Sequence, residues 1–145
     1  MALIWSIIPF YNIYNFASKF TIVLVDVKKA EVELIGDSIA RYMLDIYSDD
    51  KKMTALLERF FEEHPLVCFS KLTDRRIIST MNRFQSIYLE DGYYLYNFIE
   101  NNVLQTIKLN RQINKKYLVT DKINGKTVYF YPAERFEELL VEYYK

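Results

Sequence analysis

The residues best suited to nucleophilic, acid–base or metal chemistry are scarce in this sequence. His64 is the only histidine and Cys68 the only cysteine. Cys68 stands in the apolar run LVCFS, where burial would raise the pKa of its thiol and lower its reactivity. His64 stands before Pro65, at the expected end of a helix. No zinc, P-loop or nucleophile-elbow motif is present. The sequence therefore predicts no catalytic residue, no metal site and no cofactor.

Acidic side chains occur in adjacent pairs, at 49–50, 62–63, 90–91 and 137–138. Neighbouring residues on a helix do not share a face. We therefore interpret most of these pairs as solvated charges or as charges that favour a helix N-terminus. A hydrolase that uses two of these carboxylates is an alternative that the sequence leaves open.

Basic side chains gather in residues 66–116, which carry 8 positive and 4 negative side chains. Several follow the spacing of a helix face, and a face of this kind can contact the phosphates of a nucleic acid, an acidic protein or only solvent. The net charge of zero favours solvent. The residues with this spacing are Arg76 and Arg83 on one expected helix, and Lys108, Arg111 and Lys115 on another.

A polar turn from Lys71 to Asp74 leads into the first of these helices. Thr73 or Asp74 can accept hydrogen bonds from backbone N–H groups at the helix start, and the charge of Asp74 complements the helix dipole. Arg75 and Arg76 run against that preference, so we expect an acidic group of this chain or an anionic group of another molecule beside them. The candidate partner surface comprises Lys71, Asp74, Arg75, Arg76, Arg83, Lys108, Arg111 and Lys115.

The composition predicts one compact domain over residues 1–145. A chain of this length can bury roughly 70% of its unfolded surface, and 51% hydrophobic with 26% charged residues is an ordinary globular balance. The single cysteine fits a reducing cytosol, and the apolar segment 2–8 is too short to span a bilayer. We expect a cytoplasmic protein with no membrane partner. Its 13 tyrosines and 10 phenylalanines line either the core margin or a contact surface.

Strands are expected towards both ends of the chain. Residues 3–8 and 19–25 are rich in Ile, Val and Phe, and 11–16 is a third candidate between them. Because 19–25 is apolar on both faces, it predicts a central strand. A short buried strand is expected at 66–70. Residues 116–131 predict a hairpin, since Asn124-Gly125 supplies the positive φ angles of a tight turn.

Helical periodicity separates these strands. It predicts helices from Ile35 to Ile46, from Met53 to Phe61, from about 74 onward, from about 97 to 110, and from Pro132 to the end. The expected caps are Asp37 or Ser38 for the first helix and Asp49 or Asp50 for the second. The fold class is therefore α+β. A mixed or antiparallel sheet from N-terminal strands, a central strand and a C-terminal hairpin is packed with about four to five helices.

The segment Lys71-Leu72-Thr73-Asp74-Arg75, followed by Ile77 to Asn82, resembles a family of small uncharacterised bacterial proteins, a domain of unknown function. Members of this family show Lys, two polar residues, Asp-Arg, an apolar pair and Gly-Ser-Met-Asn. The similarity extends upstream through Trp5 and TIVLV and downstream to LNRQINK at 109–115. Ser79 stands where the family has glycine, and Arg83 where an acidic residue is common. The resemblance implies a shared fold unit and no mechanism.

On these observations we expect a non-enzymatic binding module that occupies a surface of another macromolecule, foremost another protein. Small antagonists encoded by phages or mobile elements, such as antitoxins or inhibitors of host defence nucleases, have this profile. Nucleic-acid binding through the basic helix face is one alternative. An enzyme with an unrecognised carboxylate site is another, and a homo-oligomer is compatible with each.

Overall fold

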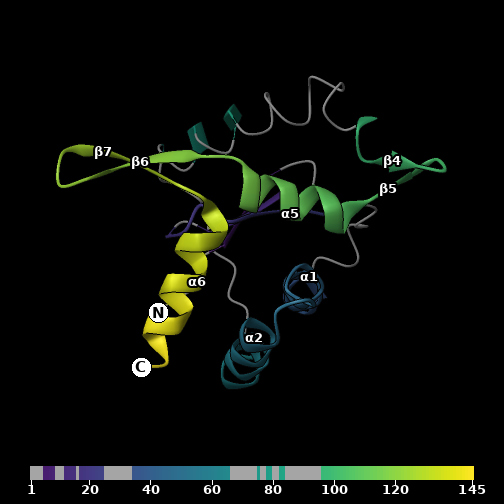
Figure 1. The fold of residues 1–145 in the computed structure, drawn as a ribbon, viewed down its shortest axis with the longest axis horizontal. Coiled ribbons are helices and arrows are strands. Elements are labelled where there is room, and N and C mark those ends of the chain that lie inside the picture. The colour runs from purple at the N-terminus through teal and green to yellow at the C-terminus, as the bar shows by residue number, and fades with distance from the viewer. Residues whose placement is uncertain are drawn as a thin grey trace.

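The structure is a computed structural model, and it describes residues 5–8, 12–15, 17–24, 34–65, 75, 78–79, 82–83 and 96–145. Within these residues all strand pairings are antiparallel, and the predicted α+β class is confirmed. The elements of Figure 1, in chain order, are β1 (Trp5–Ile8), β2 (Asn12–Asn15), β3 (Thr21–Val23), α1 (Ile35–Ile46), α2 (Lys51–Glu63), β4 (Ile99–Glu100), β5 (Val103–Leu104), α5 (Thr106–Lys116), β6 (Val119–Ile123), β7 (Lys126–Phe130) and α6 (Pro132–Tyr143).

The three N-terminal strands form one sheet in the order β1-β2-β3. Ile13 of β2 is paired with Ile7 of β1 and with Ile22 of β3. Asn15 holds the turn between β2 and β3, because its side-chain oxygen accepts from the backbone N–H and the hydroxyl of Ser18 at 2.9 and 2.7 Å. The predicted strands at this end of the chain are confirmed.

The side chains around β3 alternate between two buried clusters, as the period of a strand requires. Phe20, Ile22 and Leu24 belong to the main core with α1, α2 and α6. Val23 points to the other side and packs with Leu109 and Ile113 of α5. The strand is therefore covered on both faces.

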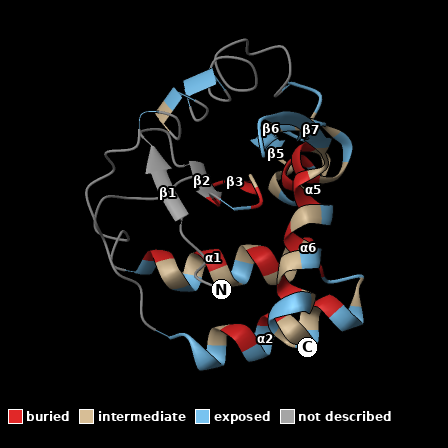
Figure 2. Cartoon of the chain, turned by 90° about the vertical axis from the view of Figure 1, so that its left-hand side faces the viewer, coloured by how far each residue is buried: buried red, intermediate tan, exposed pale blue. Residues whose placement is uncertain are grey.

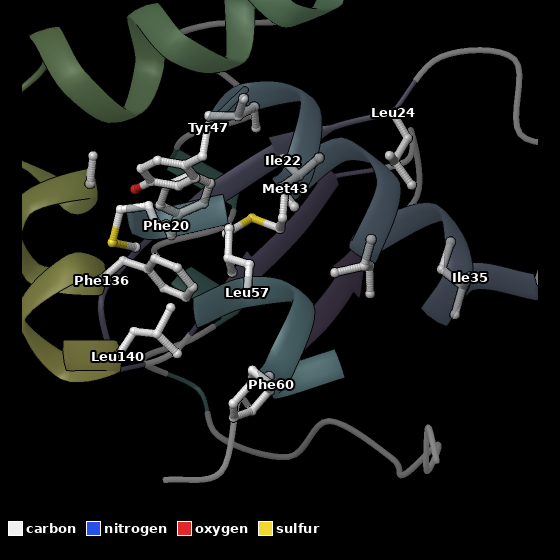
Figure 3. Close-up of a cluster of buried hydrophobic side chains, with 14 residues drawn as sticks. Phe20, Ile22, Leu24, Ile35, Met43, Tyr47, Leu57, Phe60, Phe136 and Leu140 are labelled. Atoms are coloured by element: carbon white, nitrogen blue, oxygen red, sulfur yellow. The ribbon is translucent and has the colours of Figure 1, made fainter. Parts of the chain in front are cut away.

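The main core lies where β3 meets three helices. The apolar stripes of α1 and α2 face it, as the buried positions of these helices in Figure 2 show. At its centre the rings of Phe20, Tyr47 and Phe136 lie together (Figure 3), with the centroids of Phe20 and Phe136 5.2 Å apart. Aromatic pairs at this distance contribute packing beyond their buried area.

The outer edge of β3 is closed by two asparagines of α5 rather than by another strand. Asn110 accepts from the N–H of Val23 at 2.7 Å and donates to its carbonyl at 3.1 Å. Asn114 does the same for Thr21, at 2.8 and 2.7 Å. Both asparagines are fully buried. The predicted central position of this strand is therefore wrong. β3 is an edge strand, and its outward-facing backbone groups are bonded to the side-chain amides of α5.

The ends of α1 and α2 test the predicted caps. Asp50 caps α2, since its side chain accepts from the N–H of Met53 at 3.0 Å, and α2 ends before Pro65 as expected. The predicted cap of α1 is wrong, because the helix begins one turn earlier. Leu34 occupies the cap position without a side-chain hydrogen bond, and Asp37 lies in the first turn.

The predicted helix at 97–110 is wrong over its first half. Residues 99–104 form the hairpin β4–β5, whose turn is made by Asn101 and Asn102 with φ of 51° and 63°. These left-handed angles end any helix, and asparagine adopts them at low cost. The helix α5 begins only at Thr106.

The C-terminal elements form as expected. Asn124 and Gly125, with φ of 51° and 76°, make the tight turn of hairpin β6–β7, and Pro132 opens α6. The expected strand at 66–70 and the turn at 71–74 lie outside the described residues. Beyond them Arg75, Ile78, Ser79, Asn82 and Arg83 are helical, as predicted. Among the helices that can be described, none is long and apolar enough to cross a membrane.

Because the side-chain amides of Asn110 and Asn114 bond the outer edge of β3, we expect them to be essential for stability. Asn114→Leu would leave the buried N–H and carbonyl of Thr21 without partners, so the free energy of unfolding should fall by about 3 kcal/mol. Urea unfolding measures this change. Gln112→Leu makes the same replacement of an amide side chain by leucine at a partly exposed position of α5 and should change stability little. Equal losses for the two variants would contradict the assigned role of Asn114.

Candidate interaction surface

Arg111, a predicted partner-binding residue, is held by the end of α1. Its Nε donates to the Ile46 carbonyl at 2.9 Å, and its Nη2 donates to the Asp45 carbonyl at 3.2 Å. Nη2 also donates to the Ser48 hydroxyl at 3.1 Å and lies 3.6 Å from the Asp49 carboxylate. The last turn of α1 contains no basic residue. Arg111 thus supplies the cation and the donors that a helix C-terminus needs.

The other two predicted cations of α5 also have partners within the chain. Lys108 forms an ion pair with Glu100 of β4. Lys115 lies over the ring of Tyr47, with its Nζ 5.2 Å from the ring centroid. Lys108, Arg111 and Lys115, which the sequence suggests as phosphate-binding residues, therefore each have a partner within the chain.

The remaining predicted binding residues fall into two groups. Arg75 and Arg83 are exposed. Lys71, Asp74 and Arg76 lie outside the described residues. A role of these five residues in binding stays a prediction.

Several of the paired carboxylates have structural partners within the described residues. Asp49 lies beside Arg111, and Asp50 caps α2. Glu63 accepts from Arg59 at 2.8 Å and from the Tyr144 hydroxyl at 2.9 Å.

His64 belongs to an aromatic contact between the ends of α2 and α6. Its ring lies 4.5 Å from that of Phe60, and its Nε2 is 3.1 Å from the Tyr143 hydroxyl. Cys68, four residues further along the chain, lies outside the described residues. In the part of the chain that can be described, no group of three or more His, Cys, Asp or Glu side chains is placed to hold a metal ion.

A polar group lies inside the core at the junction of α1, α5 and α6. The Tyr47 hydroxyl is buried and makes no hydrogen bond of normal geometry. Burial, and then the nearby Glu137 carboxylate, raise the pKa of this hydroxyl. Burial also raises the pKa of Glu137, with Asp50 and Glu134 adding to the rise and Tyr47 and Lys115 opposing it.

The hairpin β6–β7 projects from the molecule, with Asp121 of β6 paired to Lys19 at 3.3 Å. It extends beyond the helices at one side of the molecule (Figure 1), and most of its residues are exposed. Its register places Ile123 and Val128 on one face, and Tyr129 on the other. The large apolar side chains exposed here are Leu118 (57%), Ile123 (41%), Val128 (36%) and Tyr129 (67%). Apolar side chains are therefore exposed on both faces of this projecting element.

A shallow depression on this hairpin is lined by Thr120, Asp121, Lys122 and Thr127. Enclosed ligand sites are walled mainly by apolar side chains of several elements. The described wall of this depression is polar and comes from a single hairpin. The hairpin therefore resembles a docking surface more than a small-molecule site.

Sequence reasoning missed the burial of the two asparagines of α5 and the exposure of hairpin β6–β7. Asn110 and Asn114 are four residues apart, and each directly follows an apolar residue of α5, Leu109 and Ile113. A polar pair beside an apolar stripe was the available signal for buried amides. The hairpin itself was predicted, but its alternating pattern does not reveal which face is covered.

The contacts of Arg111 predict a structural role that lysine cannot replace. Arg111→Leu should lower the free energy of unfolding by about 1–2 kcal/mol, because the Ile46 carbonyl loses its Nε–H donor, the Asp45 carbonyl keeps only the Ser48 N–H, and the end of α1 loses a cation. Arg111→Lys should be nearly as damaging, since an ammonium lacks the planar fork. Thermal and urea unfolding measure both. Lys108→Leu, at an exposed ion pair, is the control and should cost little. A harmless Arg111→Leu would contradict this role.

The raised pKa of Glu137 predicts a pH-dependent stability. Its folded pKa lies above the ordinary 4.5, so the folded state holds this proton more tightly than the unfolded chain. The stabilisation of the folded state by this bound proton is full below pH 4.5. It is lost as the pH rises through the folded pKa of Glu137. Glu137→Gln should therefore be more stable than the wild type at pH 7, and this gain should vanish in acid. Unfolding across pH measures it, with Glu138→Gln as control. A gain independent of pH would contradict the assignment.

Comparison with known proteins supplies one match. A family model described as Domain of unknown function (DUF6933) matches residues 10–135, from just before β2 into α6. No curated protein and no solved structure matches the chain. The match confirms the resemblance to an uncharacterised family, whereas the bacterial origin stays a prediction. This chain belongs to the DUF6933 family, a domain of unknown function.

Proposed function

We propose that this chain is a non-enzymatic protein-binding module whose contact element is the hairpin β6–β7. The observation that carries the proposal is the exposure of Leu118, Ile123, Val128 and Tyr129 on one projecting hairpin. The buried centre of a protein interface is apolar, and tyrosine is enriched among the residues that contribute most of the binding energy. Tyr129 is the most exposed of the four and offers a rigid, amphipathic contact.

The charges of α5 favour a protein partner over a nucleic acid. Binding to nucleic acid depends on cations that are free to neutralise phosphates. Lys108, Arg111 and Lys115 have partners within the chain, so breaking these contacts would oppose phosphate binding. Lys122 and Lys126 of the hairpin are exposed and make nucleic acid the alternative occupant of the same element.

The module would act by occluding a surface of its partner. Its small size and the intramolecular use of its polar groups fit such a role, because occlusion needs a shaped surface and no reacting group. We place it in a bacterial cytoplasm, as an antitoxin-like regulator or an inhibitor of a host defence enzyme encoded by a phage or mobile element. The single cysteine is compatible with that reducing compartment.

The proposal predicts that charges on the hairpin abolish partner capture. The double variant Leu118→Lys/Ile123→Lys should lower the recovery of partner protein by about tenfold or more, because it places ammonium groups in the apolar contact. Capture from a lysate of the source cells, quantified by mass spectrometry, measures recovery. Ile99→Lys/Val103→Lys is the matched control, since it adds the same charge to exposed apolar positions of hairpin β4–β5.

The outcomes separate the alternatives. Loss of a partner in the hairpin variant, with recovery in the control, supports the proposal. Equal recovery by the wild type and both variants would overturn it. A mobility shift of nucleic acid at low salt that is lost in Lys122→Glu/Lys126→Glu would assign the hairpin to nucleic acid instead.

A further inference from the structure

The three described sheets differ in how their edges are closed. The outer edge of β3 is bonded to the amides of Asn110 and Asn114. On β6, the N–H of Lys122 is bonded to the Asp121 carboxylate at 2.8 Å. No comparable group closes β7 in the described part of the chain, where β6 and β7 form a sheet of two strands. An open edge strand is a template for another strand.

The register of the hairpin identifies the backbone groups on this edge. In a tight two-residue hairpin the residues flanking the turn exchange hydrogen bonds, and the pattern then alternates along the strands. Ile123 and Lys126 flank the turn, and Asp121 and Val128 form the next bonded pair. The N–H and carbonyl groups of Thr127 and Tyr129 therefore point away from β6.

These groups fit an antiparallel copy of β7 itself. A two-fold axis at Val128 sets Thr127 opposite Tyr129 of the second copy, and each such pair exchanges two backbone hydrogen bonds. Val128 then meets its own copy at the axis, a favourable pair of β-branched side chains. Lys126 lies opposite an aromatic residue, Phe130, so no like charges are paired.

Antiparallel pairing of β6 with its own copy about a two-fold axis is unfavourable. Its outward groups belong to Thr120 and Lys122, and a two-fold axis between them sets Asp121 opposite its own copy. Like charges directly opposite one another destabilise a strand pair. Asp121 is also held by Lys19 at 3.3 Å, and its oxygen already occupies the Lys122 N–H.

We propose that the chain self-associates through the free edge of β7, which pairs antiparallel with β7 of a second copy about Val128. The two hairpins then form one four-stranded sheet. The net charge of zero places no general repulsion between the copies. This association goes beyond the proposed function: it uses the edge of the hairpin and leaves its side-chain faces for a partner, doubled in area.

Sedimentation velocity from micromolar to high micromolar concentration tests the proposal. The wild type should shift with concentration from a monomer of 17.4 kDa to a dimer. Thr127→Pro removes an outward N–H from each copy and should raise the dissociation constant at least about tenfold. Thr120→Pro makes the same exchange on the outer edge of β6 and should leave association unchanged. Both prolines spare the hydrogen bonds within the hairpin, so circular dichroism should show equal folding.

A pair of charge variants locates the axis. Val128→Lys and Val128→Glu should each be monomeric, because like charges would meet at the axis. Their mixture at low salt should recover a heterodimer, because opposite charges meet there instead. This complementation cannot arise from a variant that has merely failed to fold.

Three outcomes would overturn the proposal: a wild type that is monomeric at every concentration, equal effects of the two prolines, or no recovery in the mixture. The partner-capture variants lie outside β7, so the two proposals fail separately. A chain that dimerises but captures no protein loses only the proposed function. A chain that captures a protein as a monomer loses only the self-association.

Discussion

The fold depends on how Asn110 and Asn114 complete the edge of β3. A buried edge strand exposes N–H and carbonyl groups that must find partners. A side-chain amide carries both a donor and an acceptor, so it can replace a residue of a neighbouring strand. The spacing also fits, since four helical residues rise about 6.0 Å and two strand residues about 6.7 Å. One helix thereby takes the place of a fourth strand while its leucine and isoleucine cover the sheet.

This replacement explains why α5 holds so much of the molecule together. The asparagines fix its distance and direction relative to β3, and Arg111, which directly follows Asn110, then reaches the end of α1. Lys115 meets the Tyr47 ring on the same side. The helix joins the N-terminal sheet through buried amide hydrogen bonds and the end of α1 through the guanidinium of Arg111. Its charged appearance in the sequence therefore reflects intramolecular contacts.

Local signals in the sequence were sufficient for most elements and insufficient for the candidate site. The periodicity from Ile35 to Ile46, the cap at Asp50 and the turn at Asn124-Gly125 each depend on nearby residues, and each was predicted. The partners of Asn110 and Arg111 lie 87 and 65 residues away, so no local pattern could reveal them. The hairpin at 99–104 was missed for a different reason: its apolar residues mimic a helical spacing, and the turn chemistry of Asn101-Asn102 outweighs it.

The contrast between β3 and β7 bears on how such a small domain can bind. The chain covers β3 with two buried amides and blocks part of β6 with Asp121, so its sequence contains the means to close an edge. The strand β7 has β-branched and aromatic residues at its centre, and its one charged residue, Lys126, lies at the turn end of the strand. Backbone groups and apolar side chains thus remain available on one projecting element, whereas Lys108, Arg111 and Lys115 of α5 have intramolecular partners. The proposed recognition would therefore depend more on strand pairing and apolar contact than on charge.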